Sequence, residues 1–238
     1  MNNELLSLKP GEPENEVERI KELFIPSREK MIQAMRALGL GETKIQHVKD
    51  LADFALKIAE EIEKQEGINV DKKIVEAGAL FHDIGLAKSY KDPELEPEVY
   101  PSHCVIGADI VRKLGLPERV ARCAEVHEFG GGITRKEAEE LRFPILPHKD
   151  SYAPKTIEEG IVTVADCFIF VEEVKERGWE GYDLWKNPES LKDLYFKYIN
   201  DIYKKKLGKE ISKDNPIFNR LYNINKEFFK YVKPEFLE

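Results

Sequence analysis

Cysteines, long apolar runs and basic clusters are scarce in this chain, and each scarcity excludes a class of protein. The three cysteines, Cys104, Cys123 and Cys167, form no C-x-x-C pair, so neither a disulfide framework nor a cysteine-ligated zinc site is indicated. The longest apolar stretch, residues 161–171, contains Asp166 and is far shorter than a membrane span. The first residues show no basic stretch followed by an apolar run. We therefore expect a cytoplasmic protein without membrane contact.

The charge balance of the chain excludes a further class of protein. Lys and Arg number 37 against 45 Asp and Glu, which gives a net charge of −8, and the only basic run is residues 204–206. Such a chain repels a polyphosphate backbone, so we expect no binding of polymeric nucleic acid. Charged residues make up 34% of the chain while only three glutamines occur, a bias typical of heat-adapted proteins.

The apolar pattern is helical nearly throughout. The clearest stripe lies in residues 44–64, where apolar side chains recur at helical spacing and no strand alternation competes. One further helix is predicted to begin at about residue 16, and a separate one to end at Leu38. Others are predicted over residues 71–81, 102–114, 118–127, 135–141 and 157–175. We predict an all-α fold with a helical C-terminal extension. Its parts are an arm and first helix (1–25), a main domain (26–178) and an extension packed on the same domain (179–238).

The extension is rich in aromatic residues. We expect these side chains to close the core or to form the face of a homodimer. They are Tyr195, Phe196, Tyr198, Phe228, Phe229 and Tyr231.

Four of the five histidines fall on or beside apolar faces. A single buried histidine is usually satisfied by a backbone carbonyl, but four on different helices would each need a buried partner. The four are His47, His82, His103 and His127, whereas His148 lies in a predicted loop.

Two aspartates occupy similarly apolar surroundings. Asp83 follows His82 directly, and Asp166 interrupts the apolar run with no Lys or Arg within a helical turn. A buried carboxylate costs several kcal/mol unless it is paired, so each needs a distant cation or a metal ion. Imidazole and carboxylate together suit Fe, Mn, Co, Ni or Zn rather than calcium. Six ligands exceed what one catalytic ion with open positions takes, which favours two ions and a bridging carboxylate.

Residues 81–85 read FHDIG, and here the chain resembles the HDIG branch of the HD-domain superfamily of metal-dependent phosphohydrolases. The resemblance covers about residues 40–175 and also includes the upstream His47 and the downstream Asp166. It implies an HD-domain helical bundle in which His47, His82, Asp83 and Asp166 hold a first metal ion. His103 and His127 match the additional histidines of the dinuclear subgroup, with Asp83 bridging the two ions and positioning the attacking water.

The chain departs from two specific subgroups of this superfamily. The mononuclear 5′-nucleotidases carry a glutamate three residues after the aspartate, where this chain has Leu86. The HD-GYP cyclic-dinucleotide phosphodiesterases carry a double histidine and a Gly-Tyr-Pro signature. Here Val126 precedes His127, and residues 130–133 read GGGI. Neither specificity is indicated.

Two basic residues are predicted to contact a phosphate substrate. Lys88 lies five residues after Asp83, where related proteins often place a basic side chain, and it is our candidate for both phosphate binding and proton donation. Arg135 follows the glycine turn after His127 and is predicted to line the rim of the site.

The favoured function is hydrolysis of a nucleotide or other small phosphate ester by a metal-activated water, at a site with two divalent transition-metal ions. Two alternatives remain open at this point. A di-iron oxygenase of the HD type uses the same ligand set and would depend on oxygen. A non-enzymatic metal- or nucleotide-binding sensor would explain the C-terminal extension and would turn over no phosphate ester.

Overall fold

The computed structural model describes residues 8–88, 103–127, 132–140, 152–175, 188–233 and 236. Within these ranges the chain forms α-helices and short 3-10 segments and no β-strand, so the predicted all-α fold is confirmed. In chain order the α-helices are α1 (Glu16–Leu23), α2 (Arg28–Leu38), α3 (Glu42–Glu66), α4 (Lys72–Phe81), α7 (His103–Lys113), α8 (Glu118–Val126), α9 (Arg135–Glu140), α10 (Ile157–Lys175), α11 (Pro188–Leu207) and α12 (Pro216–Asn225). Two 3-10 segments are η1 (Ile84–Leu86) and η6 (Lys226–Tyr231).

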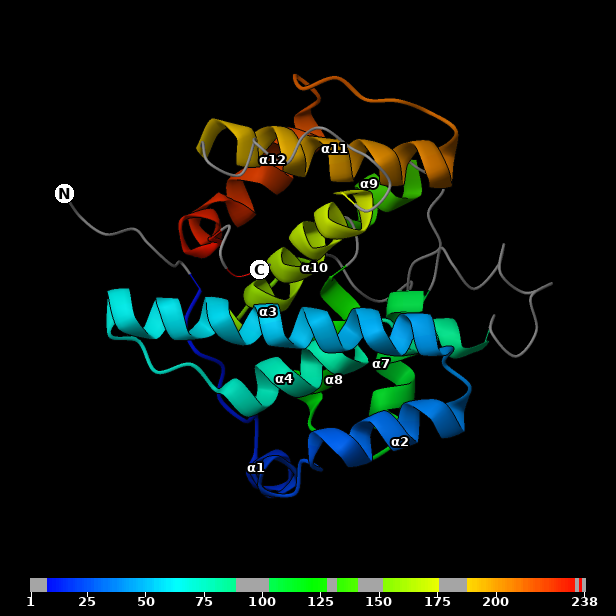
Figure 1. The fold of residues 1–238 in the computed structure, drawn as a ribbon, viewed down its shortest axis with the longest axis vertical. Helices are drawn as coiled ribbons and strands as arrows, with labels where there is room; N and C mark the ends of the chain where they lie inside the picture. Colours follow the sequence, from blue (N-terminus) through cyan, green and yellow to red (C-terminus); the bar gives the residue numbers. More distant parts are fainter. Residues whose placement is uncertain are drawn as a thin grey trace.

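Helix α3 is the central element of the bundle (Figure 1). It packs against α4 and α10, while α1 and α2 lie on one side of it and α11 and α12 on the other (Figure 1). The helix begins two residues before the predicted stripe and ends two residues after it, at Glu66, and the positive φ of the next residue, Gly67, stops the helix. The predicted stripe is fully buried and consists of Val48, Leu51, Ala55, Ile58 and Ile62.

Helix α4 ends just before the His82-Asp83 pair, where the chain turns sharply into η1; we call this turn the corner. The side chain of Asp71 caps its first turn by accepting hydrogen bonds from the backbone N–H groups of Lys73 and Ile74. The helix ends at Phe81, His82 forms the C-cap, and Asp83 leads into η1.

Gly85 allows this corner to touch α7. A Cβ atom at Gly85 would collide with the carbonyl oxygen of His103 and lie 2.8 Å from the backbone nitrogen of Gly107. Only glycine permits so close an approach of two backbones. The glycine of the FHDIG motif therefore sets Asp83 beside the first residue of α7.

The C-terminal helices complete the core. Helix α11 packs on α10, and η6 contacts α3, α10 and α11. A Cβ atom at Gly160 would meet the ring of Phe228, so this glycine of α10 lets η6 lie directly against the helix. Of the six tail aromatics, Phe196 is half-buried and the other five are buried, as expected for side chains that close the core. The homodimer and the division into three parts stay predictions.

Several sequence expectations lie outside the described residues. They concern the loop that contains His148, the first residue of the predicted helix 102–114 and the last residue of the predicted helix 135–141. Among the helices that are described, each is too short or too polar to cross a membrane.

Candidate metal centre

The structure brings all six predicted ligands together from five places in the chain. His47 lies in the first half of α3, His82 and Asp83 at the corner after α4, His103 at the start of α7, His127 at the end of α8, and Asp166 in the middle of α10. Four of these residues are buried, and the side chains of His47 and Asp166 are only 8% and 13% exposed.

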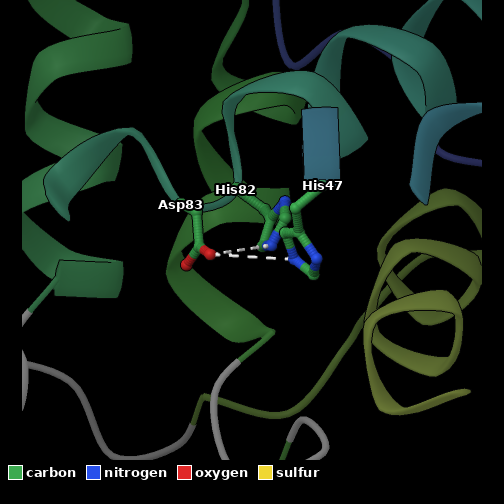
Figure 2. A group of neighbouring side chains, drawn as sticks. All are labelled: His47, His82 and Asp83. Atoms are coloured by element: carbon green, nitrogen blue, oxygen red, sulfur yellow. Dashed lines mark ion pairs between the residues drawn. The ribbon is translucent and has the colours of Figure 1, made fainter. Parts of the chain in front are cut away.

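One half of the cluster joins α3, the corner and α10. His47 Nε2 lies 3.9 Å from Asp83 Oδ2 and 3.8 Å from Asp166 Oδ1. His82 Nε2 lies 3.5 Å from each of the same two oxygens. Figure 2 shows both imidazoles turned toward the Asp83 carboxylate. Two imidazole nitrogens and two carboxylate oxygens thus face a common point.

The other half joins the corner to α7 and α8. His103 Nε2 and His127 Nε2 are 3.1 Å apart. They lie 3.1 Å and 3.7 Å from Oδ1 of Asp83. The two oxygens of Asp83 therefore face different pairs of histidines, as a carboxylate that bridges two ions would.

Backbone carbonyls fix two of the imidazole rings. Nδ1 of His82 lies 2.7 Å from the carbonyl oxygen of Ala79, and Nδ1 of His127 lies 2.7 Å from that of Ala124. A carbonyl only accepts, so Nδ1 donates in both rings, and in the neutral ring Nε2 carries the lone pair that a metal takes.

The cluster fits a divalent transition-metal ion. Ligand atoms ~2.1 Å from a common ion lie ~3.0 Å apart in an octahedral site and ~3.4 Å apart in a tetrahedral one. The distances of 3.1 to 3.9 Å between the nitrogens and the carboxylate oxygens are near these values. Nε2 of His82 is also buried and forms no hydrogen bond within the described part of the chain. A buried polar atom without such a partner is costly, and a metal ion would satisfy it.

The electrostatics of the cluster depend on its opposite charges. Burial alone would lower the pKa of His82, but the charges of Asp83 and Asp166 raise it to about 10. Burial would raise the pKa of both aspartates. The ammonium of Lys44 and the imidazole of His82 instead hold the pKa of Asp83 well below its usual range, and the imidazoles of His47 and His82, 3.8 Å and 3.5 Å away, do the same for Asp166. The carboxylates are therefore anionic and ready to bind a cation.

Sequence reasoning missed a lysine at this site. Nζ of Lys44 donates a hydrogen bond of 2.7 Å to Oδ2 of Asp83, and its side chain is 28% exposed whereas that of Asp83 is 6% exposed. Lys44 precedes His47 by three residues on α3, a spacing that places both on one face of a helix. That spacing was the available signal.

A tyrosine from the C-terminal extension was missed as well. Tyr198 of α11 donates a hydrogen bond of 2.8 Å from its hydroxyl to Oδ2 of Asp166. The two residues are 32 positions apart on different helices, so no local pattern links them.

The two predicted substrate-binding residues differ in their surroundings. Lys88 is exposed after η1 and forms no ion pair with any described residue. Arg135 is half-buried at the first position of α9. Their roles toward a substrate stay predictions.

Comparison with known proteins identifies the class. The HD domain family profile matches residues 45–169, more than half of the chain. The chain therefore belongs to the HD-domain family, and its His/Asp cluster can hold divalent metal ions.

Individual relatives extend the comparison. The uncharacterized protein MJ0778 of Methanocaldococcus jannaschii is 33% identical over 205 residues, which cover 86% of this chain and 98% of the relative. The tRNA (cytidine(56)-2'-O)-methyltransferase of Picrophilus torridus is 32% identical over 63% of this chain, and ribonuclease Y of Thermosipho melanesiensis is 30% identical over 72% of it. The matched segment spans only 38% and 27% of these two longer proteins.

Among solved structures, the HD domain of the L. monocytogenes phosphodiesterase PgpH in complex with cyclic-di-AMP matches with 18% identity and a TM-score of 0.41. The match covers 79% of this chain and 91% of that one.

Proposed function

We propose that the protein is a divalent-metal-dependent phosphohydrolase with a dinuclear centre, acting on a nucleotide or other small phosphate ester. The observation that carries this proposal is the split of Asp83, whose Oδ2 faces His47 and His82 while Oδ1 faces His103 and His127. His47, His82, Asp83 and Asp166 would hold one ion. Asp83, His103 and His127 would hold the other.

Bound divalent ions would supply an activated water and positive charge for the phosphoryl oxygens. The residues of the chain supply the geometry. The carbonyls of Ala79 and Ala124 keep the rings of His82 and His127 turned into the centre. Asp83 spans its two halves, and the buried walls around it limit the access of bulk water.

Lys44 is the cation best placed to contact the phosphate. Its ammonium already lies at a carboxylate oxygen of the centre, and its side chain is 28% exposed, so a substrate arriving from solvent could reach it. An ammonium binds a phosphate oxygen as a point charge, without the geometric demands of arginine. We assign Lys44 to substrate binding, beside the predicted Lys88 and Arg135. For proton donation to the leaving group, Lys88 or a water remains the candidate.

Polymeric nucleic acid belongs among the substrates to be tested. The net charge argues against it, yet two of the longer relatives are named as a tRNA methyltransferase and a ribonuclease. The exclusion predicted from charge therefore has no support from the comparisons. A short single-stranded RNA is the appropriate probe.

The experiment is elemental analysis of the purified protein combined with a substrate panel. The panel contains p-nitrophenyl phosphate, bis-p-nitrophenyl phosphate, nucleotides and the short RNA, each assayed with Mn, Co, Ni, Zn or Fe in air and under nitrogen. We expect turnover of at least one phosphate ester under nitrogen. Oxygen uptake by an iron-loaded protein that hydrolyses none of them would instead establish the oxygenase alternative. Metal binding without any turnover would favour the sensor.

The number of ions is tested with a histidine variant. His127→Ala removes a nitrogen that serves only the second half of the proposed centre, so bound metal should fall from about two ions to about one per chain. His148→Ala, at the histidine outside the predicted ligand set, is the control and should leave the metal content unchanged. If His127→Ala retains its metal and its rate, the site is mononuclear.

A further inference from the structure

The two oxygens of Asp166 have different partners. Oδ1 faces the imidazoles of His47 and His82 at 3.8 Å and 3.5 Å. Oδ2 points the other way and accepts the hydrogen bond of 2.8 Å from the hydroxyl of Tyr198. Since a phenol that donates to a carboxylate occupies one oxygen, this contact selects Oδ1 as the oxygen that is turned toward the histidines.

Tyr198 belongs to a part of the chain that the family profile does not cover. The matched segment ends at residue 169, whereas α11 begins at Pro188. The helix is held in place by aromatic packing: the ring of Tyr195 lies 5.4 Å from that of Phe229, which in turn lies 5.1 Å from Phe168 of α10. Tyr198 itself is only 7% exposed. The hydroxyl is thus delivered to Asp166 by a packed helix rather than by a loop.

We propose that Tyr198 is a positioning residue for Asp166, so that helix α11 completes the metal centre. The inference rests on the proposed role of Asp166 as a ligand. A carboxylate rotates readily about its last bond, and without a partner at Oδ2 it would sample orientations that do not present Oδ1 to His47 and His82. Hydrogen-bond partners behind a metal ligand fix its orientation, and their loss typically weakens metal binding 10–100-fold.

A substitution by phenylalanine distinguishes a positioning role of Tyr198 from simple packing. Tyr198→Phe keeps the ring and removes only the hydroxyl. If Tyr198 merely fills space, the variant will bind metal as the unmodified protein does. If it positions Asp166, the variant will fold but bind metal more weakly at the half of the centre that contains Asp166.

The chain offers a matched control on the same helix. Tyr195 is fully buried, and its hydroxyl accepts a hydrogen bond of 3.1 Å from Nδ2 of Asn225. Tyr195→Phe therefore removes a buried tyrosine hydroxyl from α11 one helical turn away, without touching a proposed ligand. We expect it to lower stability but to leave metal binding unchanged.

The experiment is a titration of the chelator-stripped full chain with Co²⁺. Binding is measured by calorimetry and by the visible absorption of the bound ion. We expect Tyr198→Phe to weaken one binding step by about 10–100-fold and to alter the Co²⁺ spectrum. Tyr195→Phe should match the unmodified protein. Affinity and spectrum unchanged in Tyr198→Phe would overturn the positioning role alone. Unchanged binding in Asp166→Ala as well would overturn the ligand set on which the proposed function depends.

Discussion

Two clusters of buried charge share the helices α8 and α10, and their charges are balanced in different ways. One is the metal centre, to which these helices contribute His127 and Asp166. The other we call the arginine network. It consists of Arg112, Glu118, Arg119, Arg122, Glu125, Glu158 and Glu159.

In the arginine network each buried carboxylate has a guanidinium partner. Arg122 pairs with Glu125 at 2.7 Å and with Glu159 at 3.3 Å. Arg119 pairs with Glu158 at 3.1 Å. Guanidinium groups stay charged and fork between carboxylates, so every carboxylate of this cluster lies beside a permanent cation.

The metal centre is built from weaker cations. Apart from Lys44, its carboxylates face imidazoles, which unlike guanidinium groups can give up their proton to bind a metal ion, at distances mostly longer than a hydrogen bond. Lys44 contributes one ammonium, to Asp83. The comparison teaches that burial of charge alone does not mark a functional site. A cluster whose carboxylates face mainly imidazoles does, because imidazole and carboxylate together can bind a metal ion from outside.

The largest effect that tests this difference is expected at Asp166. Asp166→Ala removes an anionic ligand from the centre, so it should abolish metal binding at the first position and with it the turnover of any phosphate ester. The helical content should remain, as circular dichroism would show. Near-normal activity together with full metal content would contradict the six-ligand site.

The converse effect is expected in the arginine network. Arg122→Met keeps much of the side-chain packing but leaves Glu125 and Glu159, which are 0% and 5% exposed, without this cation. Loss of one partner of a buried pair typically costs about 3–5 kcal/mol, so the free energy of unfolding should fall by about 3 kcal/mol in urea denaturation. Metal content should not change. A variant that loses metal instead would show that the two clusters are coupled.

The sequence predicted one of these clusters and not the other. Histidines and aspartates stood out because they interrupt apolar faces, and the helical period placed those faces in the core. Arg122 and Glu159 gave no such signal, because charged side chains on a helix normally face solvent and their burial arises only when α8 meets α10.

The same limit explains the other omissions. Lys44 shares a helical face with His47, so its place at the centre follows from spacing that the sequence contains. Tyr198 could not be predicted, because its contact with Asp166 depends on how α11 docks. The ends of α2 and α3, which Gly39 and Gly67 follow, were predicted to within about two residues, whereas no bounds were predicted for α11 and α12.

A smaller effect is expected at Lys44, the permanent cation of the centre. Lys44→Met should leave metal binding intact and raise the KM for a phosphate substrate by about tenfold, since a charge-assisted hydrogen bond contributes about 1.5 kcal/mol. Lys49→Met is the control, because Lys49 lies on the same helix and its ammonium donates a hydrogen bond to Oε1 of Gln46, which is no proposed ligand. Tighter metal binding with an unchanged KM would mean that Lys44 only neutralises Asp83.

The smallest effect concerns a half-buried ion pair that belongs to neither cluster. Glu137 accepts hydrogen bonds from Thr134 and from Arg220 of α12. Burial would raise the pKa of Glu137, but these bonds lower it below its ordinary value of 4.5. A carboxyl with a lowered pKa in the folded state stabilises the fold above its ordinary pKa, and this contribution is lost as the pH falls through the folded value.

We therefore expect Glu137→Gln to lower the free energy of unfolding by about 1 kcal/mol at pH 7 and by less at pH 3, as measured by urea denaturation at both values. The metal content at pH 7 should stay constant, because an ion pair complete in itself needs no added ion. A difference that is equally large at pH 3 would show that Glu137 acts through packing rather than through its charge. Loss of metal in this variant would mean that α9 and α12 support the centre. Ion pairs outside the centre would then also affect metal binding, against the contrast drawn here.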